Sequence, residues 1–212
     1  AAMPAKILLH ALEDPTEKKV ADLCAAPGGK TLQLAAAGCE VTAVDKSENR
    51  LSLLKNNLAR TGLYANIIKA DIENWRSKQM FDAVLLDAPC SATGTLRRHP
   101  DLAYLKSNKD TQCLAEIQVS LLKRAEMLLK PGGILVYAVC SLEAEEGQAV
   151  VNAVLRDRPI RQVAIDALPS GADPSWITHE GALQTLPCHW SDRGGIDGFF
   201  VAALKKAYDG TT

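Results

Sequence analysis

The feature that most constrains the fold is a regular alternation of short apolar runs and longer helical patterns, which extends from residue 19 to about residue 165. This alternation is typical of a parallel sheet covered by helices on both faces. The short runs are almost continuously apolar, as expected of strands that are buried on two sides. The predicted strands span residues 20–23, 41–45, 66–69, 83–87 and 134–139.

Two helices are predicted from the spacing of their apolar residues. Ser47 is a favourable N-cap for a helix with one apolar stripe, which ends near Gly62. A second helical pattern runs from about residue 111 to residue 129. It stops at Lys-Pro-Gly-Gly, residues 130–133, which predicts a turn into the next strand.

Residues 166–196 break this rhythm, because they hold several prolines and glycines and no sustained periodicity. They predict a long surface loop, which is followed by a last strand over residues 199–204. Loops of more than ~15 residues in a compact domain tend to be functional, so we expect substrate contacts here.

Charge and composition limit the partners of the chain. Its 24 Lys and Arg residues nearly balance 25 Asp and Glu residues, so any positive charge for nucleic acid must be local or come from another module. No apolar run approaches the ~20 residues that span a bilayer, and we expect no membrane partner. The six cysteines form no Cys-x-x-Cys pair, which favours reduced thiols in a cytoplasmic protein without a bound metal.

A turn of small residues follows the first predicted strand and leads into a helix. It reads Asp-Leu-Cys-Ala-Ala-Pro-Gly-Gly-Lys-Thr over residues 22–31. Small residues let a ligand approach the backbone, and the helix N-terminus offers free N–H groups. The glycine spacing matches neither the dinucleotide fingerprint nor the phosphate-binding loop, so NAD and nucleoside triphosphates are disfavoured.

Three carboxylates follow successive predicted strands. Asp45 and Asp87 end the second and fourth strands, and Asp71 follows the third. Each could cap a helix instead. Together with the glycine turn, however, they converge on the crevice where open α/β sheets bind ligands. This favours an adenosine held through its ribose rather than through phosphates, and S-adenosylmethionine fits that description.

Two cysteines occupy turns at strand ends. Cys90 follows the fourth predicted strand and Cys140 the fifth, which places both thiols beside the crevice. Cys39 and Cys113 are interpreted as buried small hydrophobic residues. Cys188 is interpreted as part of a structural loop, because His189 alone beside it makes no metal site.

These motifs resemble those of the RNA cytosine-5 methyltransferases, most closely the bacterial small-subunit ribosomal RNA enzymes of the Fmu/Sun/RsmB family. The resemblance covers about residues 1–206, and its Pro-Cys and Cys-Ser pairs are specific. The family usually has Thr where this chain has Val139, and a shorter segment before Asp197. The matching segments are residues 22–31, 44–45, 87–94, 97–101, 137–141 and 197–200.

The resemblance implies a Rossmann-like class I fold of the methyltransferases that depend on S-adenosylmethionine, with a mostly parallel seven-stranded sheet, helices on both faces and an antiparallel last strand. It implies that residues 1–212 are the catalytic domain of a longer chain, without its N-terminal RNA-binding domain. The implied cofactor-binding residues are Cys24, Ala25, Ala26, Pro27, Gly28, Gly29, Lys30, Asp45, Arg50, Asp71 and Asp87.

The implied reaction transfers a methyl group from S-adenosylmethionine to carbon 5 of a cytosine in 16S ribosomal RNA through a covalent cysteine adduct. A thiolate that adds to carbon 6 makes carbon 5 nucleophilic enough to attack the methyl group. The family implies that Cys140 is this nucleophile, that Cys90 assists breakdown of the adduct and that Asp87 contacts nitrogen 3. Lys30 is a candidate source of the positive potential that a thiolate needs.

Residues 97–99 form a basic turn after Cys90. Arg97, Arg98 and His99 could simply be a solvated turn. Their position favours phosphate contacts, because a target base must be drawn from its stack and its flanking backbone held. We therefore expect ribosomal RNA as the partner of a monomeric protein.

Other readings stay open. DNA cytosine-5 methyltransferases use the cysteine of a Pro-Cys pair, and by that analogy Cys90 would be the nucleophile. The substrate could be transfer RNA. The chain could also be a non-catalytic RNA-binding or ribosome-assembly module that retained the cofactor pocket. An NAD-dependent oxidoreductase is disfavoured by the missing glycine fingerprint.

Overall fold

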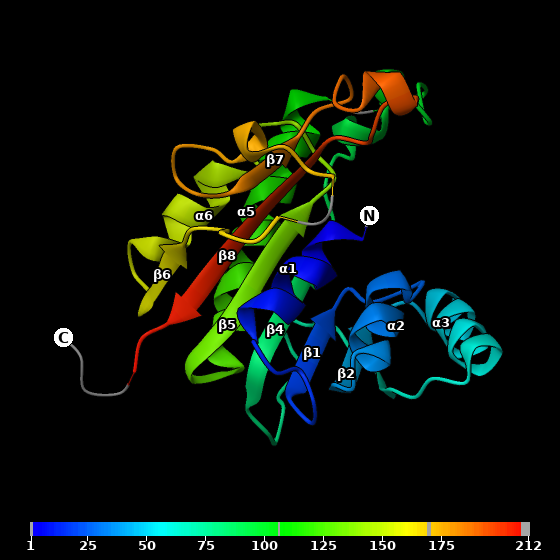
Figure 1. The fold of residues 1–212 in the computed structure, drawn as a ribbon, viewed down its shortest axis with the longest axis vertical. Coiled ribbons are helices and arrows are strands. Elements are labelled where there is room, and N and C mark those ends of the chain that lie inside the picture. The colour runs from blue at the N-terminus through cyan, green and yellow to red at the C-terminus, as the bar shows by residue number, and fades with distance from the viewer. Residues whose placement is uncertain (1, 106, 169–170, 209–212) are drawn as a thin grey trace.

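The computed structural model describes residues 2–105, 107–168 and 171–208, which form one mixed sheet with helices on both faces (Figure 1). The helices are α1 (Met3–Ala11), α2 (Gly29–Ala36), α3 (Glu48–Thr61), α4 (Leu102–Leu105), α5 (Asn108–Met127) and α6 (Gln148–Leu155). The strands are β1 (Lys19–Leu23), β2 (Glu40–Asp45), β3 (Asn66–Lys69), β4 (Phe81–Asp87), β5 (Leu129–Val139), β6 (Ile160–Val163), β7 (Leu183–Thr185) and β8 (Phe199–Lys206).

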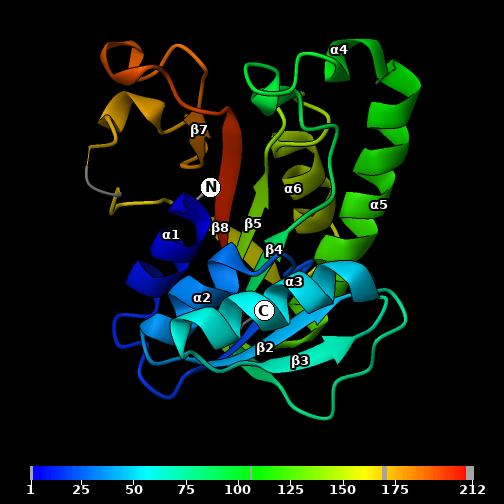
Figure 2. The same ribbon diagram turned by 90° about the vertical axis from the view of Figure 1, so that its right-hand side faces the viewer.

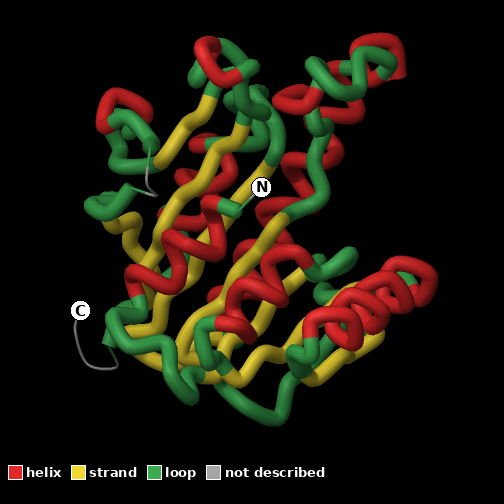
Figure 3. Tube along the Cα trace, turned by 45° about the vertical axis from the view of Figure 1, so that its right-hand side comes forward, coloured by secondary structure: helices red, strands yellow, loops and turns green. Residues whose placement is uncertain are grey.

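The sheet has the order β3-β2-β1-β4-β5-β8-β6. Strands β1 to β5 pair in parallel, whereas β8 runs antiparallel to both β5 and β6. The expected antiparallel last strand is therefore confirmed. Figure 3 shows the strands as one twisted sheet with helices packed against it. The short strand β7 also pairs with β8, so the described part of the sheet has eight strands where seven are expected.

The core consists of two apolar layers, one on each face of the sheet. Leu86 of β4 and Leu122 of α5 belong to the layer under α5 and α6. Leu85, the next residue towards the N-terminus in β4, packs in the other layer with Leu34 of α2, under α1, α2 and α3. Figure 2 shows α1 and α5 on opposite sides of the central strands. Burial on both faces explains why the central strands are almost continuously apolar, whereas the edge strand β3 is exposed at both of its ends.

The helix predicted between Ser47 and Gly62 is confirmed. The Ser47 hydroxyl accepts a hydrogen bond from the Arg50 N–H, and Gly62 ends the helix in the left-handed conformation with φ of 68°. The second predicted helix begins earlier than residue 111. Ser107 and Asp110 form a reciprocal capping box that starts α5 at residue 108.

Two predicted connections differ from the structure. Residues 130–133 are the irregular first part of β5, where the pairing with β4 shifts between Leu129 and Ile134. The segment 166–196 is more structured than a surface loop, because it contains β7 and the buried side chain of Trp176, which stacks on His189 at 4.4 Å. Residues 169 and 170 of that segment lie outside the described residues.

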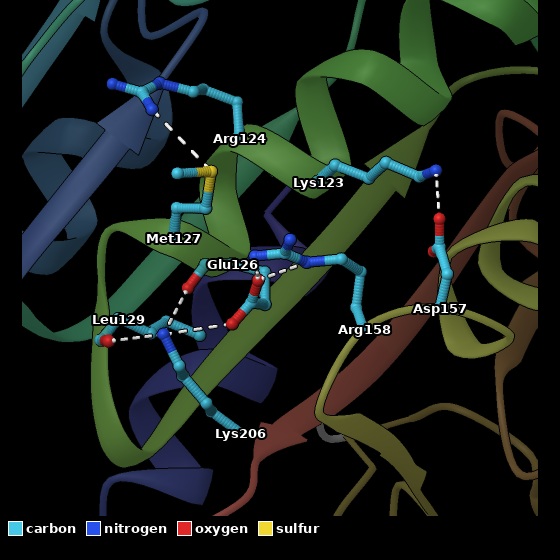
Figure 4. A network of polar contacts seen from close by, with 8 residues as sticks. All are labelled: Lys123, Arg124, Glu126, Met127, Leu129, Asp157, Arg158 and Lys206. Atoms are coloured by element: carbon cyan, nitrogen blue, oxygen red, sulfur yellow. Dashed lines mark hydrogen bonds and ion pairs between the residues drawn. The ribbon is translucent and has the colours of Figure 1, made fainter.

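A buried ion-pair cluster joins the end of α5 to β8 (Figure 4). The Glu126 side chain is 1% exposed and pairs with Lys206 at 2.9 Å and with Arg158. The Lys206 ammonium also donates to the backbone carbonyls of Glu126 and Leu129. The cluster fixes α5 on the sheet, and α5 in turn reaches the site described below.

Candidate active site

The turn after β1 forms one wall of a cavity at the carboxyl ends of the strands. Gly28 is the N-cap of α2 and has φ of +105°, a conformation that L side chains rarely adopt. A Cβ on Gly29 would meet no atom within 4 Å, so the turn is open on that side. The cavity has a volume of about 410 Å³ and is lined by Ala2, Asp22, Cys24, Ala25, Ala26, Pro27, Gly29, Lys30, Gln33 and Asp87.

A second cavity of about 320 Å³ adjoins the first, and Cys24 and Asp87 line both. It extends from the end of β2 to the turns after β4 and β5. The structure thus brings together the residues predicted from the cofactor turn, the strand-end carboxylates and the two thiols. The residues of the second cavity that the sequence singles out are Cys24, Asp45, Arg50, Asp71, Asp87, Cys90 and Cys140.

Asp45 holds the cofactor turn in place. Its side chain is 2% exposed, and its carboxylate accepts hydrogen bonds from the N–H groups of Ala26 at 3.2 Å and Ser47 at 3.0 Å. Arg50 pairs with the same carboxylate at 3.2 Å and donates to the Ala26 carbonyl. Asp71 is exposed and accepts from the Glu73 N–H. Asp45 therefore orients backbone groups besides facing the cavity.

Sequence reasoning overlooked Asp22 as a functional carboxylate, although a charged residue inside an apolar strand is a readable signal. Asp22 is fully buried, and burial is the main cause that raises its pKa to about 7. One carboxylate oxygen accepts from the Thr31 hydroxyl at 2.6 Å. The other has no hydrogen-bond partner in the described structure, although Asp22 lines the first cavity. Asp22 thus offers a buried carboxylate oxygen that can accept a hydrogen bond from a positively charged group.

The thiols of Cys90 and Cys140 touch. Their Sγ atoms lie 3.4 Å apart, and both side chains are half-buried. The hydrogen bond between the two thiols is the largest cause that lowers the pKa of Cys140, and the same bond is the largest cause that raises the pKa of Cys90. Burial, aided by nearby carboxylates, raises the pKa of the third thiol, Cys24, to about 12. Cys140 is therefore the cavity thiol that ionises most readily.

Lys30 and Asp87 form an ion pair whose charges both act on Cys140. The Lys30 ammonium pairs with the Asp87 carboxylate at 2.6 Å, and the Lys30 side chain is 13% exposed. The charge of Lys30 contributes to the lowered pKa of Cys140, whereas the charge of Asp87 opposes it. The pair therefore leaves Cys140 in a nearly neutral surrounding rather than a strongly positive one.

The basic turn after Cys90 is exposed, but it is not free of partners. Arg98 makes a bidentate contact with Asp197, with nitrogen–oxygen distances of 2.7 and 3.0 Å. Arg97 lies 3.9 Å from the same carboxylate, and His99 is exposed. Asp197 therefore neutralises much of the positive charge that the sequence suggests for RNA phosphates.

Two glycines let the basic turn pack on the start of β8. Gly198 donates its N–H to the Gly94 carbonyl at 2.8 Å. A Cβ on Gly94 would lie 2.1 Å from the Gly198 carbonyl oxygen, so no larger residue fits there. This close approach carries Asp197 to Arg98.

The remaining cysteines lie away from the cavities. Cys39 is buried, as expected, whereas Cys113 is exposed on α5, so its interpretation as a buried residue is wrong. Cys188 is exposed. Among the described residues, no three His, Cys, Asp or Glu side chains cluster in a way that could hold a metal ion, and no helix there is long and apolar enough to cross a membrane.

Comparison with known proteins agrees with this geometry. Residues 9–205 match the model of the family described as 16S rRNA methyltransferase RsmB/F. The chain is 42% identical over 192 residues to a ribosomal RNA small subunit methyltransferase B of Salmonella arizonae. That alignment covers 88% of this chain and 42% of the relative, so the chain spans less than half of the relative's length.

Solved structures show the same fold. The structure of NSun6 from Pyrococcus horikoshii with SFG superposes with a TM-score of 0.83 at 28% identity, covering 99% of this chain and 53% of that one. The crystal structure of PH0851 superposes with a TM-score of 0.82 at 32% identity, covering 96% and 46%. The Rossmann-like methyltransferase fold is thereby confirmed.

Proposed function

The chain belongs to the RsmB/F family of 16S rRNA methyltransferases, and on this premise we propose that it transfers a methyl group from S-adenosylmethionine to carbon 5 of a cytosine in 16S ribosomal RNA. The observation that carries the proposal is the contact between the Cys90 and Cys140 thiols, which favours a thiolate on Cys140 beside the cavity. Such a thiolate is the nucleophile that cytosine needs before its carbon 5 can react.

The residues along the two cavities fit S-adenosylmethionine. Asp22 presents a buried oxygen that has no hydrogen-bond partner in the described part of the chain, and this oxygen suits the ammonium group of the ligand. Asp45 and Asp71 line the adjoining cavity and suit the ribose hydroxyls. When bound, S-adenosylmethionine supplies a methyl group activated by its sulfonium. The open side of Gly29 leaves room for a ligand against the cofactor turn.

The cysteines divide the chemistry between them. Cys140 adds as a thiolate to carbon 6 of the cytosine, and the ring then attacks the methyl group through carbon 5. A base from solvent takes the proton on carbon 5, and the C6–S bond breaks, so that Cys140 leaves as a thiolate and the ring double bond is restored. Cys90, whose sulfur lies 3.4 Å from that of Cys140, assists this breakdown. Asp87 contacts nitrogen 3, and Lys30 offsets the charge of Asp87.

RNA is held beside this site by the basic turn. Arg97 and His99 are the members of that turn that we assign to phosphate contacts, because Arg98 makes a close bidentate contact with Asp197, whereas Arg97 approaches the same carboxylate only to 3.9 Å. Arg98 then acts by keeping the turn in place. The segment 166–196, which packs on β8, is assigned to contacts with the RNA that flanks the target.

The rival assignment, with Cys90 as nucleophile, is disfavoured by the direction of the two pKa shifts. The same asymmetry argues against a non-catalytic RNA-binding module, since a binding surface has no need for an ionised thiol. Methylation of transfer RNA instead of ribosomal RNA is distinguished by the experiment below.

Mapping of 5-methylcytosine by bisulfite sequencing tests the proposal. Ribosomal and transfer RNA from cells that lack the native enzyme are incubated with the protein and S-adenosylmethionine, in parallel with its Cys140→Ala variant. We expect one cytosine of 16S ribosomal RNA to become protected by the wild type and none by the variant. Protection that is confined to transfer RNA, or no cysteine-dependent protection at all, contradicts the proposal.

A further inference from the structure

A buried carboxylate joins the two cysteine turns. Ser91 follows Cys90, and Ser141 follows Cys140. Both serine hydroxyls donate to the same Oε2 atom of Glu146, with a distance of 2.5 Å from Ser141. The two hydroxyl oxygens also lie 3.0 Å apart. One carboxylate oxygen therefore connects the turn after β4 to the turn after β5.

The second oxygen of Glu146 extends the connection to α5. Oε1 accepts from the Ser91 N–H at 2.9 Å and from the Gln118 amide at 3.0 Å. The same Gln118 amide donates to the carbonyl of Pro89, directly before Cys90, at 2.9 Å. The Tyr137 hydroxyl donates to the Glu146 backbone carbonyl at 2.6 Å. Four donors thus compensate the burial of a carboxylate that is 0% exposed.

We propose that Glu146 is a positioning residue: it holds the Cys90 turn against the Cys140 turn, so that the Cys90 and Cys140 sulfur atoms stay in hydrogen-bond contact. This role rests on the proposed function, in which Cys140 is the nucleophile. The two turns are also joined by the Gly94 N–H, which donates to the Cys140 carbonyl at 3.0 Å, and by the Leu142 N–H, which donates to the Thr93 hydroxyl at 3.0 Å. Glu146 adds a bond to each of the two serines that directly follow the cysteines.

The negative charge of Glu146 also favours a protonated Cys90, in agreement with its role in holding the two turns together. The hydrogen bond with Cys140 raises the pKa of Cys90 most, burial is second, and the negative charge of Glu146 adds to both. The proton that the two thiols share is therefore held on Cys90. The other charged or titratable groups facing the pair are Asp87 from β4, Lys30 from α2, Tyr137 from β5 and Arg98 from the basic turn.

The rates at which the two thiols react with iodoacetamide test the proposal. The rates are followed by peptide mass spectrometry between pH 5 and 10 in the purified wild type and in Glu146→Gln. The matched control is Glu145→Gln, which removes the neighbouring exposed carboxylate. Because an amide no longer fixes both serines, we expect the midpoint for Cys140 to rise by about one pH unit, which slows its reaction at pH 7 about tenfold. The control keeps the wild-type profile.

Two further measurements separate positioning from general damage. Glu146 lines neither cavity, so Glu146→Gln keeps the wild-type affinity for S-adenosylmethionine. In methylation assays we expect its kcat to fall with KM for RNA unchanged. If Glu146→Gln does not fold, as judged by its thermal transition, the Ser91→Ala/Ser141→Ala double variant takes its place, with the same expected direction.

An unchanged midpoint for Cys140 in a folded Glu146→Gln variant overturns the proposal, and so does an equal shift in Glu145→Gln. The labelling needs no RNA, so its result stands whether or not the protein methylates RNA. Conversely, if Cys140→Ala abolishes methylation but Glu146→Gln leaves both labelling and kcat unchanged, the positioning role is wrong and the proposed function survives.

Discussion

Asp22 makes the affinity for S-adenosylmethionine depend on pH near neutrality. Its carboxyl is fully buried, one of its oxygens has no hydrogen-bond partner among the residues that the structure describes, and its pKa is raised to about 7. An ammonium group in the first cavity binds the ionised carboxylate and not the neutral acid. Binding therefore lowers the pKa of Asp22 and releases its proton, so affinity falls as the pH drops below 7.

The size of the effect follows from the ionised fraction of Asp22. With a pKa of about 7, that fraction is about one eleventh at pH 6 and about ten elevenths at pH 8, a ratio of about ten. We therefore expect the Kd for S-adenosylmethionine to be about tenfold higher at pH 6 than at pH 8, a difference of about 1.4 kcal/mol. At pH 7, about half a proton leaves Asp22 for each ligand bound.

Isothermal titration calorimetry in buffers of different ionisation enthalpy measures both quantities. Asp22→Asn keeps the shape of the side chain but cannot titrate. Any pH dependence of Kd that remains in this variant therefore comes from other groups, including those of the ligand. The reasoning is refuted if Kd is equal at pH 6 and pH 8, or if Asp22→Asn keeps the wild-type pH dependence and proton release.

The same site gives a stability prediction without ligand. The pKa of Asp22 in the folded protein, about 7, lies above its unfolded value of 3.8. The free energy of unfolding therefore falls as the pH rises between these two values, by on the order of 4 kcal/mol at pH 8. Urea unfolding at pH 8 should therefore show Asp22→Asn to be more stable than the wild type. Equal stability of the two proteins at pH 8 contradicts the burial argument.

Three other substitutions test ion pairs. Glu126→Ala leaves Lys206 and Arg158 without their buried partner and should lower the free energy of unfolding in urea by about 3 kcal/mol. Lys123→Ala breaks an exposed ion pair and should lower it by less than about 1 kcal/mol. Equal losses of unfolding free energy in the two variants contradict the argument from burial. Lys30→Met leaves the Asp87 charge uncompensated and should raise the pH at which the Cys140 thiol is half-alkylated; an unchanged midpoint shows that the Lys30 charge does not act on Cys140.

Much of the site could be predicted from the sequence because it consists of strand ends. The apolar runs place Asp45 and Asp87 at the ends of buried strands and Cys90 and Cys140 in the turns that follow, and parallel strands bring their carboxyl ends to one edge. The glycine turn follows β1 at the same edge of the sheet, so its place in the wall of the cofactor cavity could be predicted as well. The contact between the two thiols could not be predicted in this way, because their distance depends on the register of β4 against β5.

Contacts across long stretches of sequence could not be predicted. Arg98 and Asp197 are 99 residues apart in the chain, and their pairing depends on the close approach of Gly94 to Gly198. Glu146 has acidic neighbours at positions 143 and 145, and nothing in this pattern indicates which of the three is buried. The strand β7 has three residues, too few for a periodicity.

The covalent adduct between RNA and a cysteine tests the central claim most directly. The protein and its Cys90→Ala and Cys140→Ala variants are incubated with 16S ribosomal RNA and S-adenosylmethionine, and the RNA-linked protein is quantified on a denaturing gel. If Cys140 attacks carbon 6 and Cys90 assists breakdown, Cys90→Ala accumulates the crosslinked species and Cys140→Ala forms none. A crosslink that persists in Cys140→Ala and disappears in Cys90→Ala contradicts the account.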